Sequence, residues 1–405
     1  MRIPSLLAAL ALALPFAACA APDYGRALPP GAPALLPLKH DEKRPDFSEG
    51  FANRDEIVPA LDRSIEWFKK ESSKQHFPIE QITHARAQAS VIRFRQLLFE
   101  ARDAGDFTRR LNHEFQVYRS AGWNAKGGGV LFTAYCTPIF DGSRTPDATY
   151  RFPLYGLPPD LAKAKDGAIL GRRAADGSIS GPYPTRREIE ASAMLEGKGL
   201  ELVYLKDPLD AFIAHVNGSA FVKTPNGEEL KFGYSGKNGR EYSSLGKELI
   251  RAKELKSKDM SLEGIRKWGR NNPDKLSEYM SRNDSYVFFL EIDGNPRGSL
   301  NLEVEGNRTI ATDKALFPRG GLVFVEAPPA TKKWRWPWES KPRADPAFHQ
   351  FMLDQDTGGA IRTAGRADLY LGVGPDAERR AGHVMSEGQM YYLFLREDQL
   401  LDVAP

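Results

Sequence analysis

The sequence predicts a mainly β protein that begins with helices and has enough residues for two domains. The chain has 405 residues, a length that supports two substantial cores. Between residues 55 and 121, apolar residues recur at three- and four-residue spacing, which is the period of an amphipathic helix. From residue 127 onward, short apolar or alternating runs are separated by Asp-Gly, Pro-Asn-Gly and Gly-Lys-Asn-Gly turns. Such runs are typical of a small barrel or sandwich.

The N-terminus carries the features of a signal peptide, which we place at residues 1–18. Small residues directly before Cys19 resemble a bacterial lipobox, with Phe16 in place of the usual leucine. Cleavage there would leave Cys19 as a lipidated first residue, and Ala20 favours an outer membrane lipoprotein that faces the periplasm. The alternative is an ordinary secretory signal cut near Ala21, which would give a soluble periplasmic protein.

The elements follow in order along the chain. Residues 19–54 are rich in Pro and Ala and then charged, so we expect a tether from the lipid to the folded body. Helices are expected from 55 to 121, with Gly122 closing the last one. Further helices are expected at 243–251, at 260–268 and after Asn272, where Pro273 would take the first position. Strands are expected at 130–139, 150–155, 200–205, 211–222 and 229–234, and from 286 to the end.

Two features have no assigned chemistry. The only other cysteine, Cys136, lies in an apolar run, so we expect a small buried hydrophobic residue rather than a nucleophile. The tryptophan-rich segment 332–338 could touch lipid headgroups or sugar rings. It could equally be a surface loop whose tryptophans pack on the body.

Several functional classes are poorly supported. A formal net charge of +3 is too small to indicate a nucleic-acid partner, and no basic run is interleaved with aromatics. The seven histidines are scattered, so no metal site is expected, and no other cofactor is implied. The sequence has no Gly-x-Ser-x-Gly elbow and no Walker-type loop. The single Asp356-Thr357-Gly358 triplet would make an aspartic protease only in a dimer.

Carboxylates next to glycine are the strongest candidates for chemistry. Asp356 and Asp368 lie in the glycine-rich run from 354 to 374, and Asp368 directly precedes a short alternating strand. Asp313 lies upstream, before another apolar run. Acidic side chains at strand ends beside glycine are placed to meet a ligand.

These aspartates carry a family resemblance. Asp313, the run from Asp356 and the run from Asp368 resemble the three-aspartate (3D) domain, a double-psi β-barrel. Seven upstream segments resemble the membrane-bound lytic murein transglycosylase A family, in collinear order. They are Thr133–Pro138, Arg151–Tyr155, Pro184–Ile189, Asn217–Ser219, Tyr234–Gly239, Ile265–Trp268 and Ser285–Phe289. The resemblance covers roughly residues 55 to 395.

The resemblance implies cleavage of the β-1,4 bond between N-acetylmuramic acid and N-acetylglucosamine in peptidoglycan, with a 1,6-anhydro product. Asp368 would then be the single general acid and base. Such an acid needs a raised pKa, through burial or a neighbouring carboxylate. Asp356 and Asp313 are candidate supporting carboxylates, or they only cap turns in the barrel.

The candidate substrate-binding residues are polar groups beside glycine or at strand edges, which suits hydrogen bonds to sugar substituents. They are Thr133, Tyr135, Asn217, Ser219, Lys237 and Asn238. The family usually has Gly-Tyr-Tyr where this chain has residues 134–136, and Gln-Gly-Ser-Gly where it has residues 217–220. These departures leave the subsite preference open.

We therefore expect two domains with a groove between them. Residues 55–137 and 294–400 would form the first, the helices plus the 3D barrel, and residues 138–293 would form an inserted β domain. The implied partners are peptidoglycan glycan strands and the outer membrane, and proteins of cell-wall synthesis are further candidates. Two alternatives stay open, a two-carboxylate glycoside hydrolase and a peptidoglycan-binding lipoprotein without catalysis.

Overall fold

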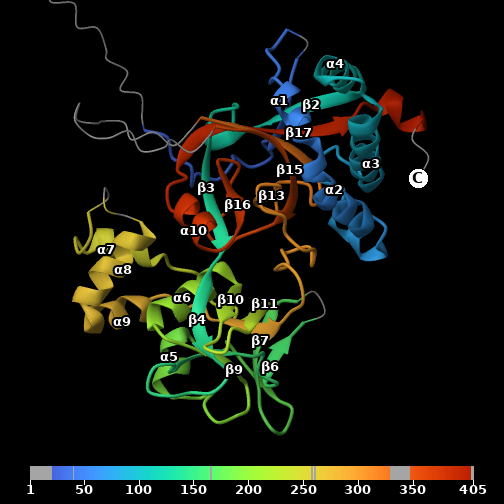
Figure 1. Cartoon of the computed structure of the whole chain (residues 1–405). Helices are drawn as coiled ribbons and strands as arrows, with labels where there is room; N and C mark the ends of the chain where they lie inside the picture. Colours follow the sequence, from blue (N-terminus) through green and yellow to red (C-terminus); the bar gives the residue numbers. More distant parts are fainter. Residues whose placement is uncertain are drawn as a thin grey trace, which may run out of the picture.

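A computed structural model describes residues 21–39, 41–164, 167–256, 259, 261–328 and 347–402. The signal peptide, Cys19 and the tryptophan-rich segment 332–338 lie outside these residues. The described chain forms two lobes (Figure 1), a barrel covered by helices and a second β lobe inserted into it. Among these residues, no helix is both long and apolar enough to cross a membrane.

The first lobe is built on a sheet that closes on itself. In the described chain this sheet has eight strands in the order β1-β2-β17-β14-β15-β13-β16-β3, and β3 also pairs with β17. The second pairing closes β17, β14, β15, β13, β16 and β3 into a barrel, so these strands have no free edge. Two of its pairs, β3 with β16 and β13 with β15, are parallel. The strands are β1 (Leu35–Pro37), β2 (Phe115–Ser120), β3 (Val130–Thr137), β13 (Thr309–Ala311), β14 (Leu322–Ala327), β15 (Phe348–Asp356), β16 (Arg366–Val373) and β17 (Ser386–Leu395).

Helices cover this barrel, as the three- and four-residue spacing predicts. In α3, the side chain of Thr83 accepts a hydrogen bond from the backbone N–H of Arg86 and so caps the first turn. The same helix buries Val91, Phe94 and Leu97 in the core that it shares with the barrel. The helical elements of this lobe are α1 (Ser48–Ala52), α2 (Arg54–Phe68), η1 (Glu71–His76), α3 (His84–Glu100), α4 (Ala104–Glu114), η2 (Gly122–Asn124), α10 (Pro375–Ala381) and η4 (Glu397–Asp402).

The second lobe has its own sheet and core. Among the described residues, its main sheet has six strands in the order β12-β11-β10-β4-β9-β5, and a bridge between Gly156 and Phe289 links the two outer strands. A smaller sheet, β6-β7-β8, lies beside it. The strands are β4 (Ile139–Ser143), β5 (Phe152–Tyr155), β6 (Leu161–Lys163), β7 (Ile169–Arg173), β8 (Ile179–Ser180), β9 (Glu201–Leu205), β10 (Ala220–Lys223), β11 (Glu229–Lys237) and β12 (Val287–Glu291). The helices are α5 (Arg186–Ala191), α6 (Pro208–Asn217), α7 (Leu245–Arg251), α8 (Leu262–Asn271) and α9 (Pro273–Ser281).

The chain enters the second lobe at Pro138, between β3 and β4, and leaves it after β12. The predicted fold class, a mainly β protein with N-terminal helices, a barrel and an inserted β domain, is confirmed. The groove between the two domains stays a prediction.

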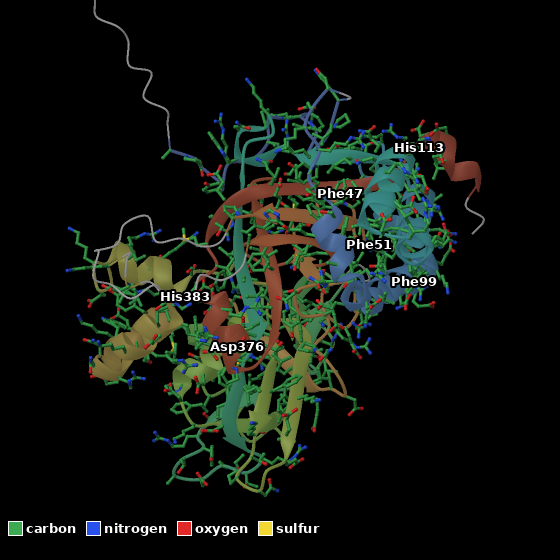
Figure 2. The ribbon with its side chains drawn as sticks, turned by 45° about the horizontal axis from the view of Figure 1, so that its top comes forward. Phe47, Phe51, Phe99, His113, Asp376 and His383 are labelled. Carbon is green, nitrogen blue, oxygen red and sulfur yellow. The ribbon has the colours of Figure 1, made fainter. Side chains whose placement is uncertain are left out.

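The tether prediction for residues 19–54 is wrong for its second half. Residues 35–37 form β1, which pairs antiparallel with β2. Phe47 is fully buried and packs against Phe324 and Phe351 of the barrel, at ring-centroid distances of 5.0 and 5.6 Å. Figure 2 shows Phe47 and Phe51 against the barrel. The segment is charged and rich in proline, so its few buried apolar residues, such as Phe47, form no recognisable sequence pattern.

Two predicted elements have the wrong type. Residues 115–120 were expected to continue a helix, but they form β2, which pairs with β1 and β17. Residues 211–222 were expected to form one strand, but α6 occupies 208–217 and β10 begins at 220. The helix signals were present: Asp207 caps α6, Pro208 takes its first position and Gly218 ends it in a left-handed conformation. His215 therefore lies on a helix, where its Nδ1 accepts a hydrogen bond from the backbone of Val287.

Two further local predictions are confirmed, and one is wrong. Pro273 takes the first position of α9, as predicted, but the side chain of Asn272 does not cap this helix and donates to the carbonyl of Trp268. Cys136 is buried, and burial raises the pKa of its thiol to about 12. A thiol that stays protonated at neutral pH is a poor nucleophile.

Candidate active site

The candidate acid lies where two parallel strands of the barrel meet. Strands β3 and β16 place Asp368 opposite Thr133 and Tyr370 opposite Tyr135. Partner residues in a ladder share a face of the sheet, so Thr133, Tyr135 and Asp368 face the same side. The buried Leu369, next to Asp368, points to the core instead. The alternation that predicted this strand therefore also turns Asp368 away from the barrel interior.

Asp368 is partly buried and has one side-chain donor. The hydroxyl of Thr133 donates to Oδ1 of Asp368 at 2.8 Å, and an Nη of Arg366 donates to the Thr133 hydroxyl at 3.2 Å. Burial raises the pKa of Asp368 to about 6, and the nearby charge of Asp356 acts in the same direction. The Thr133 hydrogen bond and the charge of Arg366 oppose this rise. The result is a carboxyl group that can carry a proton close to neutral pH, as a general acid must.

Asp356 is held differently, by three hydrogen-bond donors. Its Oδ2 accepts from the hydroxyl of Tyr135 at 2.6 Å, and its Oδ1 accepts from the backbone N–H groups of Ser299 and Thr357, both at 2.8 Å. Burial raises the pKa of Asp356, while these donors lower it. Both oxygens are therefore engaged, which suits a fixed carboxylate that orients its neighbours.

The remaining predicted site residues do not join this cluster. The carboxyl of Asp313 accepts from the backbone N–H groups of Ala315 and Thr363, so it supports a turn, as one of the two alternatives expected. Asn238 is 1% exposed. Its amide nitrogen donates to the carbonyls of Pro184 and Asp284, and its amide oxygen accepts from the backbone N–H groups of Arg240 and Tyr286. These hydrogen bonds argue against contact with substrate.

The other three predicted substrate-binding residues are on the inserted domain. The amide of Asn217 donates to the carbonyl of Ile213 within its own helix. Ser219 is buried, and its hydroxyl lies 3.1 Å from that of Thr137 at the junction of the two lobes. Lys237 ends β11 and is partly buried. A role in binding substrate stays a prediction for these residues.

Sequence reasoning missed two residues beside the acid. Arg366 lies two positions before Asp368 on the same face of β16, and this period-two relation could have identified it. Tyr242 comes from the loop after β11 in the inserted domain. Burial raises the pKa of Tyr242, and the charge of Asp368 adds to this rise. No local pattern links Tyr242 to a strand more than a hundred residues away.

Comparisons with known proteins agree with this architecture. Residues 131–290 match the MltA specific insert domain, and residues 308–394 match the 3D domain. The chain is 32% identical over 277 residues to membrane-bound lytic murein transglycosylase A of Vibrio cholerae, a match that covers 68% of each protein. The chain belongs to the membrane-bound lytic murein transglycosylase A family. A second member, from Escherichia coli K12, is 31% identical over 278 residues, which is 67% of this chain and 68% of that protein.

Solved structures of the lytic murein transglycosylase A family share the fold. A membrane-bound lytic murein transglycosylase from Agrobacterium tumefaciens superposes with a TM-score of 0.71 at 23% identity, over 90% of this chain and 98% of that chain. The E. coli family member with bound chitohexaose has a TM-score of 0.64 at 24% identity, over 89% and 94%. The predicted family, with its 3D domain and inserted β domain, is therefore confirmed, and so is the prediction that the chain is an enzyme of this class.

Proposed function

We propose that this chain cleaves the β-1,4 bond between N-acetylmuramic acid and N-acetylglucosamine in peptidoglycan without consuming water. Asp368 would act as the single general acid and base. The observation that carries this proposal is the contrast between the two carboxyl groups. Burial raises the pKa of Asp368 to about 6, whereas both oxygens of Asp356 already accept hydrogen bonds. One group is poised to give a proton and the other is fixed in place.

In the proposed reaction, protonated Asp368 donates its proton to the glycosidic oxygen as the bond from that oxygen to C1 of the muramic acid breaks. Positive charge develops on the sugar ring, and the ionised carboxylates of Asp368 and Asp356 would stabilise it. Asp368 then takes the proton of the 6-hydroxyl of the same sugar while that oxygen bonds to C1. The 1,6-anhydro ring closes, Asp368 regains its proton, and no water enters the balance.

The products of purified murein test this proposal. We expect mass spectrometry of the digest to find muropeptides that end in 1,6-anhydro-muramic acid, one water lighter than hydrolytic products. Reducing muramic acid ends would instead indicate a hydrolase with two working carboxylates. Binding of murein without release of any fragment would support a non-catalytic wall protein.

The hydrogen bond from Thr133 to Asp368 leads to a second, independent prediction, about the pH dependence of cleavage. In the wild type, kcat/KM should fall as pH rises through about 6, because Asp368 must be protonated to act as the acid. Thr133→Val keeps the shape of the side chain but removes the donor that stabilises the ionised carboxylate. The pKa of Asp368 should then rise further, and the fall in kcat/KM should move to higher pH by about one unit.

The pH profiles of the wild type and Thr133→Val, measured on the same murein, check this expectation. Thr133→Ser retains the hydroxyl and is the matched control, whose midpoint should stay with the wild type. A midpoint that moves to lower pH in Thr133→Val would contradict the role of this hydrogen bond.

We also propose that a lipid on Cys19 holds the enzyme at the outer membrane, facing the periplasm. The family name of the relatives includes the words membrane-bound, and the sequence before Cys19 resembles a lipobox. The mass of the N-terminal peptide of the mature protein would show or exclude the lipid. Proteins of cell-wall synthesis stay predicted partners.

A further inference from the structure

A pocket of about 650 Å³ lies on the inserted domain, and no residue of the cluster around Asp368 lines it. This volume falls within the range of small-ligand sites. Strand β7, the segment before α5, α5 itself and the loop after β11 form its walls. Its lining residues are Arg172, Pro182, Pro184, Glu188, Ala191, Ser192, Met194 and Arg240.

Two arginines of this pocket are anchored through their Nε atoms. Nε of Arg172 donates to Oδ2 of Asp160 at 2.7 Å, and Nε of Arg240 donates to the carbonyl of Tyr183 at 2.7 Å. Tyr183 is fully buried, and its hydroxyl donates to the other oxygen of Asp160 at 2.8 Å. Tyr183 therefore contacts Arg240 through its carbonyl and Asp160, the partner of Arg172, through its hydroxyl. Within the described part of the chain, the terminal nitrogens of Arg172 and Arg240 have no hydrogen-bond partner. These outer faces of the guanidinium groups are available to a ligand.

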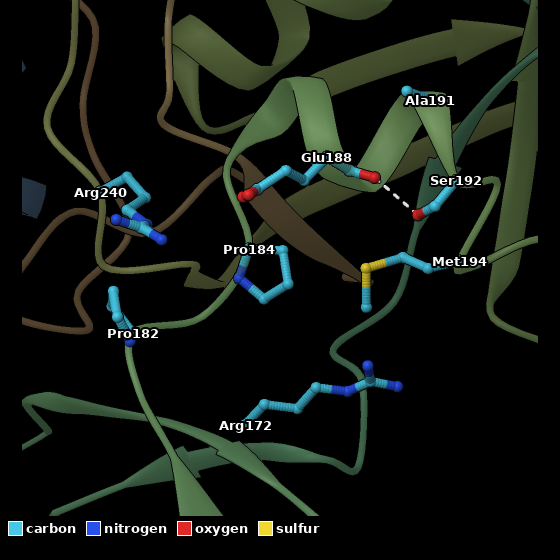
Figure 3. A pocket seen from close by; sticks show the side chains of 8 residues that line it. All are labelled: Arg172, Pro182, Pro184, Glu188, Ala191, Ser192, Met194 and Arg240. Atoms are coloured by element: carbon cyan, nitrogen blue, oxygen red, sulfur yellow. Dashed lines mark hydrogen bonds between the residues drawn. The ribbon is translucent and has the colours of Figure 1, made fainter.

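The pocket also contains one acid and an apolar wall. Figure 3 shows Arg240 and Glu188 on one side, Arg172 on the opposite side, and Pro184 with Met194 between them. Oε2 of Glu188 accepts from the backbone and hydroxyl of Thr185, which fixes the carboxylate, and these bonds with the charge of Arg240 lower its pKa. The pocket therefore presents two cations, one anion and apolar surface, which is the complement of a short peptide that carries carboxylates and an amine.

The loop after β11 connects this pocket to the catalytic cluster. Arg240 and Tyr242 are two residues apart, a span of at most about 7 Å, and Gly359, which Tyr242 contacts, is three residues after Asp356. Tyr242 packs closely on Gly359, because a Cβ built on that glycine would lie 3.4 Å from the Cβ of Tyr242. An extended tetrapeptide spans about 13 Å, which is longer than the backbone step from Tyr242 to Arg240.

We propose that this pocket binds the peptide stem carried by the muramic acid of the substrate. The proposal rests on the function proposed above and adds a selectivity to it. Guanidinium groups of Arg172 and Arg240 would pair with stem carboxylates, Glu188 would accept from the stem amine, and Met194 with Pro184 would contact apolar side chains. The enzyme should then cleave strands with stems more efficiently than bare strands of the same murein.

The experiment compares intact murein glycan strands with strands stripped of stems by an amidase. Arg172→Gln removes one cation of the pocket, and kcat/KM on intact strands should fall about tenfold, the usual effect of losing a charge-assisted hydrogen bond. On stripped strands it should stay within about twofold of the wild type. Arg173→Gln is the matched control, since Arg173 is the next residue of β7 and does not line the pocket. Arg240 is left intact because its loop also carries Tyr242.

A second pair of variants changes only charge. Ala191 is an exposed residue of α5 on the pocket wall, so Ala191→Glu places a like charge opposite the stem carboxylates. It should lower kcat/KM on intact strands about fivefold or more, while Ala191→Gln, of the same size, should not. The free stem peptide should bind the wild type in titration calorimetry and bind Ala191→Glu more weakly.

Equal losses on intact and stripped strands, or no loss in either Arg172→Gln or Ala191→Glu, would overturn the stem-binding proposal. Activity of the wild type on stripped strands tests the proposed function separately. A wild type without activity on either substrate would refute the function, whereas cleavage without a preference for stems would refute only this inference.

Discussion

Replacing Asp368 by asparagine should lower the rate of murein cleavage about 1000-fold or more while murein binding is retained. Proton transfer by a positioned side chain is worth about 10² to 10⁴ in rate, and in the proposed mechanism one residue supplies both transfers. Asparagine has the shape of aspartate and its Oδ1 can still accept from Thr133, but it cannot donate an acidic proton. The release of soluble muropeptides and a pull-down with insoluble murein measure the two quantities.

Asp356→Asn provides the comparison that separates the single-acid mechanism from a pair of equal carboxylates. Both oxygens of Asp356 accept from donors, so an amide nitrogen would meet one of these donors and disturb the site. We expect a partial loss of activity with the anhydro product unchanged. If the Asp368→Asn variant still cleaves murein, another residue must be the acid. If both variants lose the same amount of activity, the two-carboxylate hydrolase is favoured.

The sequence identifies Asp368 as the candidate acid because the signals at Asp368 are local. Alternation after Asp368 identifies a strand, and the strand turns its side chain away from the buried Leu369. The partners of Asp368 are a different problem, since Thr133 is 235 positions away and reaches it only through the parallel register of β3 and β16. The resemblance to a family supplied Thr133 and Tyr135, but not their hydrogen bonds.

Two of the three errors in the predicted fold also arise from long-range pairing. Residues 115–120 follow a helix without a break in apolar spacing, and only pairing with β1 and β17 makes them a strand. Phe47 lies in a charged, proline-rich segment, and its aromatic partners Phe324 and Phe351 are about 280 and 300 positions away. In α6 the apolar run favours a strand, whereas Asp207 and Gly218 mark the two ends of a helix. Long-range pairing decided the first two cases and local capping the third.

A buried ion pair between Lys314 and Asp354 lies in the barrel core, two residues along β15 from Asp356. The Nζ of Lys314 donates to Oδ1 of Asp354, while the hydroxyls of Thr312 and Tyr392 donate to Oδ2 at 2.8 Å. The side chain of Lys314 is 6% exposed and that of Asp354 is 0% exposed. Asp354 is two residues before Asp356 on β15, and the charge of Lys314 offsets part of the rise that burial causes in the pKa of Asp356. The pair therefore lies in the barrel core, close in the chain to Asp356.

Lys314→Met should lower the free energy of unfolding by about 3–5 kcal/mol, because it leaves the carboxylate of Asp354 buried without its cation. The double variant Lys314→Met/Asp354→Asn removes both charges and should recover most of this loss, since a neutral pair has no unpaired charge to bury. Urea unfolding followed by circular dichroism gives the three free energies. Lys69→Met is the control, because Lys69 pairs with Glu66 on the surface of α2 with 58% of its side chain exposed, and such pairs contribute about 0–1 kcal/mol. A Lys314→Met protein no less stable than this control would show that the buried pair does not hold the barrel together.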